Sequence, residues 1–370
     1  MISILQSDSR PLHHWAFLLL ILLTIVAYYP GLSGDYMFDD TSNLLQNQAL
    51  DMESLDMDSL TDAAWSSGAG LLRRPVSMAS FALNRFFFGI DPFSHKVVNL
   101  IIHVLTGCLL YLFSHLLLAA YQQYRQPRLS TTATRWIPVI VCGMWLVHPL
   151  NLTSVLYIVQ RMTSLATLFM VTGLCLYVVG RMQMLRGRSG LSIILVGLFC
   201  LGGLAILSKE NGILLPLYML VIEFTVFRFQ GANQNPDKSI ITLFTLILAI
   251  PALFALLYLV THTDSMLNYS HRDFTLWERV LTEPRVLIFY LKMIIMPSVQ
   301  ELGLYHDDFS LSHRLLSPFS TLPAILAIAG LLTAGLLLRT LRPLVSLGIL
   351  WFFTGHVLES TILPLELAHE

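Results

Sequence analysis

Long apolar runs separated by short polar links dominate this chain. An α-helix needs roughly 20 predominantly apolar residues to cross the hydrocarbon core of a bilayer, and about nine segments approach that length. The pattern therefore predicts about nine membrane helices, of which the third is short. They cover residues 15–32, 96–120, 136–150, 163–181, 190–207, 212–229, 239–261, 320–339 and 343–358.

The basic residues indicate how these helices are oriented. The N-terminus and four links contain 11 of the 22 Lys and Arg residues, but only Asp8 and Asp237 of the 23 acidic residues. The four links are 121–135, 181–190, 228–238 and 339–342. They alternate along the expected topology, as the tendency of cytoplasmic loops to be basic requires. The two long loops, 31–95 and 262–319, are therefore expected outside the cytoplasm.

Composition supports the same class. Of the 370 residues, 55% are hydrophobic and 12% charged, against roughly 25% charged residues in soluble domains. The formal net charge is −1 and nothing indicates a nucleic-acid partner. We expect an all-α polytopic integral membrane protein, with one membrane domain over residues 1–370 and no separate soluble domain. The stretches 74–90 and 284–297 are too short or too charged to span, and they suit helices lying in the membrane interface.

Two features place polar groups at or near the membrane. Asp39 and Asp40 stand side by side just after the first apolar run. His95, Asn99 and His103 are spaced at i, i+4 and i+8, which puts them on one face of a helix. The histidine stripe has three interpretations: packing and hydrogen bonding between helices, a direct role towards substrate, or metal ligation. Packing is favoured, because no acidic or cysteine partner sits at ligand spacing.

Several cations lie on the same side of the expected topology as the two aspartates. They are Arg73, Arg74, Arg161, Lys209 and Arg285. Each also has a structural interpretation, since long basic side chains extend to lipid headgroups. Taken together, two carboxylates and several cations beside lipid suit group transfer from a lipid phosphate. One carboxylate accepts the proton of an acceptor hydroxyl, and the cations stabilise the departing phosphate.

Four segments, in this order and spacing, carry a resemblance to a known family. They are "YYPGLSGDYMFDD", "RRPVSMASFALNRFFFGIDPFSHKVVNLIIHVLTGCLLYLF", "WLVHPLNLTSVLYIVQRMTSLATLFM" and "LAILSKENGILLPLYMLVIE". This region resembles the membrane part of the transmembrane and tetratricopeptide-repeat-containing (TMTC) protein O-mannosyltransferases and their bacterial relatives. These belong to the GT-C glycosyltransferases, and the resemblance covers most of residues 25–300. The chain departs from the TMTC pattern in that it contains no tetratricopeptide repeats, so it is expected to be a fragment or a bacterial short form.

The resemblance implies an enzyme that transfers a sugar, typically mannose, from a polyprenyl-phosphate donor, with inversion, to a hydroxyl outside the cytoplasm. Protein Ser or Thr is the favoured acceptor. The family's acidic motif maps onto Asp39 and Asp40, one as the base and the other as its support, with the division between them open. Its other motifs map onto His148, Pro149, Arg161, Ser208, Lys209 and Glu210. With Arg74, His103 and Arg285 added from their chemistry, the expected donor-phosphate and substrate-binding residues are Arg74, His103, His148, Arg161, Lys209, Glu210 and Arg285.

A second acidic pair, Asp307 and Asp308, follows His306 in the second outer loop. It is a candidate site for the acceptor or a divalent cation, the alternative being a solvated turn that caps the next helix. Beyond the lipid-linked donor, no cofactor is expected, and no metal ligands are assigned, while a requirement for a divalent cation stays open. The bacterial inner membrane is favoured, with the endoplasmic reticulum membrane as the alternative. Two rival functions stay open: a GT-C transferase that modifies a glycan or lipid, and a transporter or flippase for lipid-linked glycans.

Overall fold

The computed structural model describes residues 12–125, 129–263, 267–303, 306, 309–365 and 367. Over these residues the chain is helical and contains no β-strand beyond two isolated bridges, which confirms the all-α class. The chain forms two compact units. Unit 1 comprises Met1–Val179 and Ile193–Ile213, and unit 2 comprises Gly180–Ser192 and Leu214–Glu370. The expectation of one membrane domain stays a prediction.

The apolar segments are all helical, although they differ in length. Within the described residues, six helices are long and apolar enough to cross a membrane. They are Leu12–Gly31, Pro92–Arg125, Ile158–Leu185, Leu191–Ser208, Glu210–Phe227 and Lys238–Thr261. A seventh candidate is the pair Thr131–Leu146 and Pro149–Leu156, whose halves are bent by 53°. The last two segments form shorter helices, Thr321–Leu337 and Pro343–Gly355. The integral membrane class is thereby confirmed, while the exact count of nine is not.

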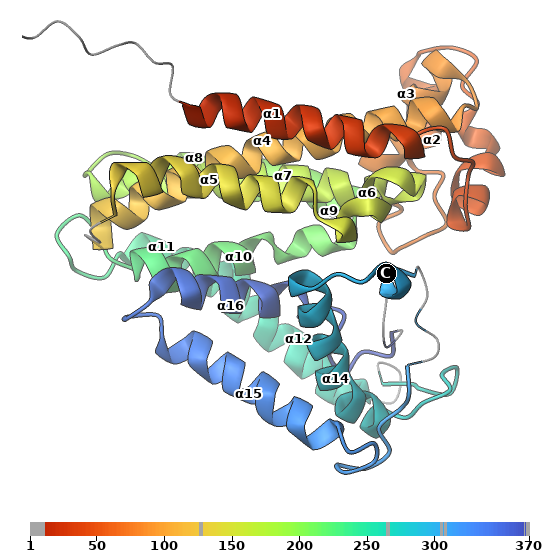
Figure 1. Ribbon diagram of the computed structural model, residues 1–370. Helices are drawn as coiled ribbons and strands as arrows, with labels where there is room; N and C mark the ends of the chain where they lie inside the picture. The colour runs from red at the N-terminus through yellow and green to blue at the C-terminus, as the bar shows by residue number, and fades with distance from the viewer. Residues whose placement is uncertain are drawn as a thin grey trace, which may run out of the picture. The chain divides into compact units, whose positions relative to one another are not determined.

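In unit 1, α1 (Leu12–Tyr28), α4 (Pro92–Arg125) and α5 (Thr131–Leu146) pack against one another (Figure 1). The contact between α4 and α5 is close, because Gly107 leaves room for the Leu146 side chain and Cys142 Sγ lies 3.0 Å from the Gly107 carbonyl. Helix α5 begins before the expected residue 136, since the Ser130 hydroxyl accepts a hydrogen bond from Ala133 N–H and caps it.

The first outer loop of unit 1 has its own buried core, which packs onto the start of α7 (Arg161–Leu185). Helices α2 (Met57–Ala64) and α3 (Pro75–Phe88) contribute Ala63, Met78 and Phe81 to this core, and the segment before α7 contributes Ile158. The rest of unit 1 is completed by α6 (Leu152–Leu156), the residues of α8 (Leu191–Leu195) from Ile193 onward, and α9 (Gly202–Ser208). The loop is therefore held in a defined place on unit 1.

In the part of unit 2 that the structure describes, six α-helices belong wholly to this unit. They are α10 (Leu215–Ile222), α11 (Lys238–Phe244), α12 (Ile250–Thr261), α14 (Leu276–Ile295), α15 (Thr321–Leu337) and α16 (Pro343–Gly355). Helix α15 packs against α14 and α16, and α16 packs against α10. The expected start of α14 near Pro284 was wrong. Thr275 and Glu278 form a reciprocal capping box that begins the helix eight residues earlier, so Pro284 lies inside it.

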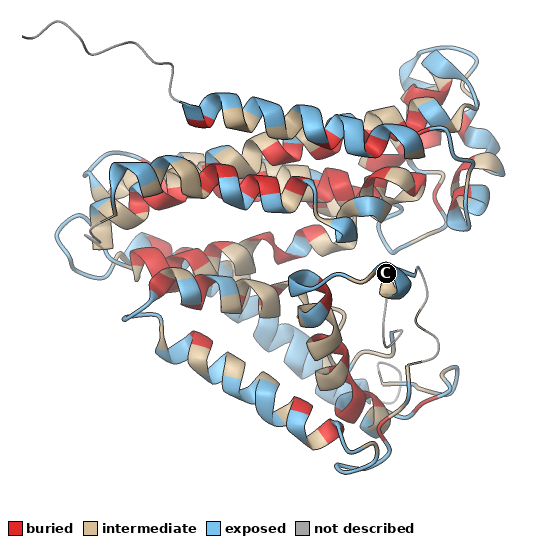
Figure 2. Cartoon of the chain, in the orientation of Figure 1, coloured by how far each residue is buried: buried red, intermediate tan, exposed pale blue. Residues whose placement is uncertain are grey.

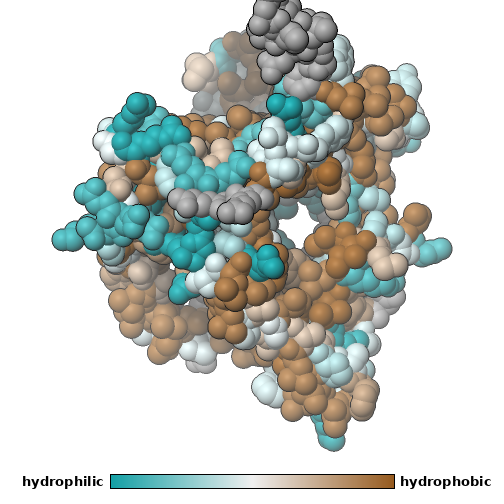
Figure 3. Space-filling model, turned by 60° about the vertical axis from the view of Figure 1, so that its left-hand side comes forward, coloured by the Kyte–Doolittle hydropathy of each residue, from teal (hydrophilic) through white to brown (hydrophobic). Residues whose placement is uncertain are grey.

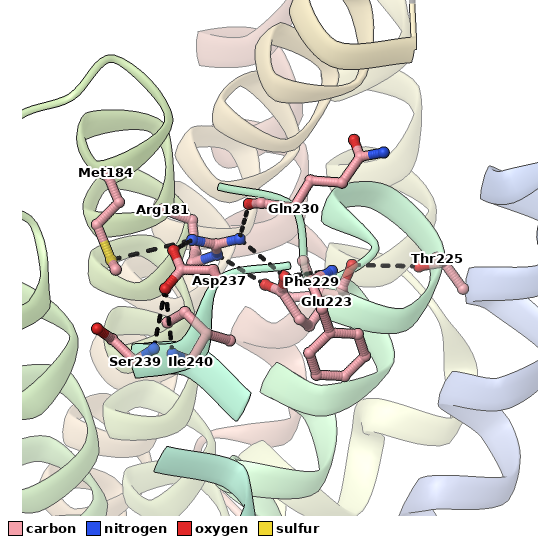
Figure 4. A network of polar contacts seen from close by, with 10 residues as sticks. Arg181, Met184, Glu223, Thr225, Phe229, Gln230, Asp237, Ser239 and Ile240 are labelled. Atoms are coloured by element: carbon pink, nitrogen blue, oxygen red, sulfur yellow. Dashed lines mark hydrogen bonds and ion pairs between the residues drawn. The ribbon is translucent and has the colours of Figure 1, made fainter. Parts of the chain in front are cut away.

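A buried ion-pair network in unit 2 ties the end of α7 to the segment after α10 (Figure 4). The Arg181 guanidinium binds both carboxylate oxygens of Glu223, at 2.8 and 2.9 Å, and lies 3.0 Å from Asp237. The side chains of Arg181 and Glu223 are fully buried. Asp237 also caps α11 by accepting from Ser239 N–H, so a single cluster fixes three segments.

The outer surfaces of several helices are apolar and exposed. Helix α12 has no buried residue and is pale blue in Figure 2. On α1, Leu18, Leu19 and Leu22 each have more than half of their surface exposed. Figure 3 shows hydrophobic side chains over much of one face of the molecule. Such surfaces suit contact with lipid tails rather than water.

Candidate active site at the start of α7

The segment that leads into α7 receives polar contacts from three distant parts of unit 1. This segment comprises Tyr157, the 3₁₀ turn Ile158–Gln160 and the first residues of α7. The first outer loop reaches it through Asp39 and Asp40, the start of α3 through Arg74, and the end of α9 through Lys209. Residues from four separate sequence motifs therefore meet at one place.

Asp40 is fully buried and serves as an anchor. Its Oδ1 accepts a hydrogen bond from Val159 N–H at 2.7 Å, and its Oδ2 accepts one from Met37 N–H at 3.1 Å. Burial raises the pKa of Asp40 above its ordinary value, and these backbone hydrogen bonds and the nearby Lys96 ammonium counteract part of the rise. The carboxylate thus joins the loop to the 3₁₀ turn before α7.

Asp39 is exposed, and its backbone is fixed. Its N–H donates to the Tyr157 hydroxyl at 3.1 Å, and its carbonyl accepts from Asn43 Nδ2 at 2.9 Å. Among the described residues, the hydrogen bonds found for Asp39 all involve its backbone. The preceding residue, Phe38, has φ 41°, a left-handed conformation that a bulky residue rarely adopts. This strained turn lies directly before the two aspartates, of which Asp39 is exposed and Asp40 is buried.

A buried lysine on α4 binds the backbone of the first outer loop. Lys96 Nζ donates to the carbonyls of Gly34, at 2.7 Å, and Asp35, at 3.3 Å. The residue is 2% exposed, and its charge lies near Asp40. A buried ammonium needs such partners because desolvation is otherwise costly. Lys96 and Asp40 therefore both hold the first residues of the loop, Lys96 at Gly34 and Asp35, and Asp40 at the turn before α7.

Arg74 and Lys209 bring positive charge to the start of α7. Arg74 forms a half-buried ion pair with Glu210, with 3.0 Å between Nη2 and Oε2, and also contacts Met162 Sδ. Arg73 and Arg74 both adopt left-handed φ, of 55° and 49°. Lys209 Nζ donates to Thr163 Oγ1 at 2.8 Å, in the first turn of α7. The amino end of a helix together with cations favours anionic groups.

Arg161, by contrast, is directed into the protein. It is fully buried, and all five of its N–H groups donate to neutral oxygens. Nε binds Asn99 Oδ1 at 2.7 Å, and Nη2 binds Asn84 Oδ1 and the His95 carbonyl, both at 2.8 Å. Nη1 binds the carbonyl and hydroxyl of Ser80 at 3.2 Å. These contacts tie α3 and α4 to α7, which favours a structural role; a role in donor binding stays a prediction.

Comparison with curated proteins gives relatives of a single kind. The chain is 25% identical over 221 residues to protein O-mannosyl-transferase F38B6.6 of Caenorhabditis elegans, an alignment covering 58% of this chain and 29% of that protein. It is 26% identical over 251 residues to human protein O-mannosyl-transferase TMTC4, covering 64% and 34%. Human TMTC2 is 27% identical over 213 residues, covering 55% and 23%. No family model and no solved structure matches the chain.

The chain is TMTC-like in sequence. This agrees with the resemblance seen in the motifs. The chain spans about a third or less of the length of these relatives and therefore corresponds to only part of such a protein.

In this TMTC-like chain the remaining expected residues of unit 1, His103 and His148, lie near the end of α5. His103 is buried on α4, where Nε2 donates to the Leu146 carbonyl at 2.9 Å and the ring stacks on Trp145 with centroids 4.5 Å apart. His148 lies in the link after α5, and its Nδ1 accepts from Leu150 N–H at 3.3 Å, which caps a 3₁₀ turn. The stripe of His95, Asn99 and His103 is buried as a whole, which supports its interpretation as a packing face.

Arg285 and His306 lie in unit 2. Arg285 donates to the Ser310 carbonyl at 2.6 Å and the Ser312 hydroxyl at 3.1 Å, and burial lowers its pKa. It lines a groove of about 700 Å³ together with Lys292 and the rings of Phe289 and Phe309. His306 packs against Phe289. Asp307 and Asp308 lie outside the described residues. Among the residues that are described, no group of three His, Cys, Asp or Glu side chains is placed to hold a metal ion.

Sequence reasoning missed three residues that shape the site. They are Lys96, Tyr157 and Thr163, which bind the loop backbone, Asp39 N–H and Lys209 respectively. Lys96 carried a detectable signal, since it is a charge at the start of an apolar helix. Tyr157 and Thr163 carried none, because a tyrosine or threonine beside a membrane helix is ordinary.

Proposed function

We propose that this chain is an integral membrane mannosyltransferase that uses a polyprenyl-phosphate-linked mannose, with Asp39 as the catalytic base and a protein Ser or Thr hydroxyl as the favoured acceptor. One observation carries the proposal: exposed Asp39, held through its backbone, contacts the same short segment, Tyr157 to Thr163, that Arg74 and Lys209 contact. The names of the relatives, which are O-mannosyl-transferases, support the sugar and the type of acceptor.

The proposed transfer needs only the Asp39 carboxylate, the acceptor hydroxyl and the lipid-linked donor. The Asp39 carboxylate takes the proton of the acceptor hydroxyl as its oxygen bonds to the anomeric carbon of mannose. The bond between that carbon and the phosphate oxygen breaks, and the phosphate leaves with the electron pair as polyprenyl phosphate. Attack opposite the leaving group inverts the anomeric centre. A phosphate is a good leaving group, so no general acid is required.

Lys209 and the start of α7 are proposed to hold the phosphate. The Lys209 ammonium, placed by Thr163 in the first helical turn, adds charge where the helix dipole already favours an anion. Arg74 contacts the neighbouring residue, Met162, with its charge partly offset by Glu210. Negative charge that develops on the departing phosphate is thereby stabilised.

The test is a choice of donors. Purified protein in lipid nanodiscs is given polyprenyl-phosphate mannose, polyprenyl-phosphate glucose or a nucleotide-linked mannose, with a Ser/Thr-rich peptide. We expect free polyprenyl phosphate and mannosylated peptide from the first donor alone. Consumption of only the nucleotide-linked sugar contradicts the proposal. Preference for the glucose donor contradicts the assignment of mannose but not the lipid-linked chemistry.

Transport is the second candidate, and the bent pair of helices supports it. Transporters use interrupted membrane helices near their binding sites, and Thr131–Leu146 with Pro149–Leu156 is such a pair. The two functions differ in products. In sealed vesicles a transporter moves the intact mannose lipid across the bilayer, whereas a transferase separates mannose from the lipid.

The active site is proposed to face away from the cytoplasm, in a bacterial inner membrane or, alternatively, the endoplasmic reticulum membrane. Support comes from the distribution of charge, since 11 of the 22 basic residues lie in the N-terminus and the four links that the expected topology puts opposite to the first outer loop. Labelling of a cysteine introduced at exposed Asp62 with an impermeant reagent tests this orientation. Labelling only after the membrane is opened contradicts it.

A further inference from the structure

Unit 1 contains a cavity of about 170 Å³ whose lining is polar although it lies among apolar helices. Helix α4 contributes His103 and Thr106, α5 contributes Trp145, and the remaining lining residues come from the segment after α5 and from the first two turns of α7. Five of the lining residues carry hydroxyl groups: Thr106, Ser154, Thr163, Ser164 and Thr167. A polar cavity of this kind requires a polar occupant.

The cavity lies at the break between α5 and α6. The two halves meet at 53°, and both contribute lining residues, Trp145 from the first and Ser154 from the second. A break frees carbonyls at the end of α5, and side chains bind two of them. Asn151 Nδ2 donates to the Trp145 carbonyl at 2.7 Å, and His103 Nε2 donates to the Leu146 carbonyl. Irregular backbone among membrane helices is tolerated where it is buried or lines a wet cavity.

The protons of the lining hydroxyls are largely used within the protein. Thr106 donates to the Ile102 carbonyl at 2.8 Å and Thr167 to the Thr163 carbonyl at 2.8 Å. Ser164 donates to the Ser154 carbonyl at 3.0 Å. A hydroxyl has one proton and two lone pairs, so these groups keep only acceptor capacity. His103 also keeps only acceptor capacity. The Leu146 carbonyl can only accept a hydrogen bond, so the proton of the neutral imidazole lies on Nε2 and Nδ1 is an acceptor.

These observations define the occupant. It donates hydrogen bonds, because the lining offers acceptors. It is uncharged, because no Asp, Glu, Lys or Arg side chain lines the cavity. It occupies the volume of about five to six waters, at about 30 Å³ each, which is the size of one monosaccharide ring. Trp145 adds a flat apolar wall of the kind that a sugar ring also presents.

We propose that this cavity binds the sugar ring of the donor. The inference rests on the proposed function and extends it, because it separates a phosphate subsite from a sugar subsite. Thr163 belongs to both: it accepts from Lys209, and it lines the cavity. In this arrangement the first turn of α7 lies between the subsite for the phosphate of the donor and the subsite for its sugar ring.

The experiment compares two threonines on the same helix. Thr167 lines the cavity, whereas Thr172 does not, and both are half-buried and donate to the carbonyl four residues earlier at 2.8 Å. Thr167→Val and Thr172→Val remove the same hydroxyl with the same change of shape. Thr167→Ser restores the hydroxyl. Two probes are used with protein in nanodiscs: a short prenyl phosphate that carries mannose, and the same prenyl phosphate without sugar.

We expect Thr167→Val to weaken binding of the mannose-bearing probe roughly 3- to 10-fold, the effect of one neutral hydrogen bond. Binding of the bare prenyl phosphate stays unchanged, Thr172→Val behaves as wild type, and Thr167→Ser restores affinity. Equal effects on both probes, no effect on either, or no preference of the wild type for the sugar-bearing probe overturns the inference. Because binding is measured without turnover, a sugar-specific effect in a protein that transfers nothing contradicts the proposed function alone.

Discussion

Replacing Asp40 by asparagine tests whether this carboxylate is an anchor. The wild-type side chain accepts two backbone hydrogen bonds, from Val159 and Met37, in a fully buried position. An amide retains one acceptor oxygen and turns its NH₂ towards the other N–H. The variant therefore loses one charge-assisted hydrogen bond, worth about 1.5–3 kcal/mol, and leaves one buried donor unpaired, at a cost of about 1–3 kcal/mol.

Removing a buried charge offsets part of this cost, since burial already raises the pKa of Asp40. We expect a net loss of about 1–3 kcal/mol in the free energy of unfolding, or several degrees in Tm. The matched control is Asp39→Asn, which changes the exposed neighbour and is expected to shift stability by less than about 0.5 kcal/mol. Tryptophan fluorescence during thermal unfolding in nanodiscs measures both. Equal Tm values for wild type and Asp40→Asn, or a larger loss in Asp39→Asn, refute the division of roles.

Three further predictions concern other charged groups. Lys209→Met removes the proposed phosphate contact, so the KM for the donor should rise roughly 10- to 100-fold; an unchanged KM contradicts this role. Arg181→Ala leaves Glu223 buried without its ion-pair partner and should destabilise the fold by about 3–5 kcal/mol, whereas Ala at exposed Arg188, measured in the same thermal unfolding assay, should have little effect. Burial raises the pKa of Glu283, on helix α14, from 4.5 to about 7. Its contribution to stability is thus present below pH about 4.5 and is lost as pH rises through about 7, and Glu283→Gln should flatten that part of a Tm profile measured between pH 4 and 8.

The sequence predicted the helical class because membrane helices leave a strong local signal. The first apolar run, for example, is expected at 15–32 and observed at Leu12–Gly31. Helix ends were less accurate, since they depend on specific caps. The start of α14 is set by the hydrogen bonds between Thr275 and Glu278, which lie before the apolar stretch expected to begin at residue 284.

Part of the expected site is brought together by the structure, and the function of its residues stays a prediction. The acidic pair, Arg74 and Lys209 were all identified from sequence, and the structure brings them to one segment. The sequence alone does not show which of two adjacent aspartates is exposed and which is buried. They differ only in the folded chain, where Asp40 is buried against Val159 and Met37 N–H and Asp39 is exposed.

Arg161 shows the opposite case. Its neutral partners come from α3 and α4, more than 60 residues away, so its burial has no local signature. The sugar-sized cavity was equally hidden, because it arises from a break between α5 and α6 that a hydropathy pattern reads as one short span.

The central claim is that Asp39 is the base of a mannosyl transfer, and one measurement tests it most directly. Wild type, Asp39→Asn and Asp62→Asn, a control that changes another exposed aspartate on unit 1, are compared in nanodiscs with polyprenyl-phosphate mannose and a Ser/Thr-rich peptide. We predict that Asp39→Asn binds the donor and unfolds at the wild-type Tm but transfers mannose at least 100-fold more slowly, since general-base catalysis contributes about 10²–10⁴-fold. Asp62→Asn should transfer at the wild-type rate. Transfer by Asp39→Asn within a few-fold of the wild-type rate contradicts the account.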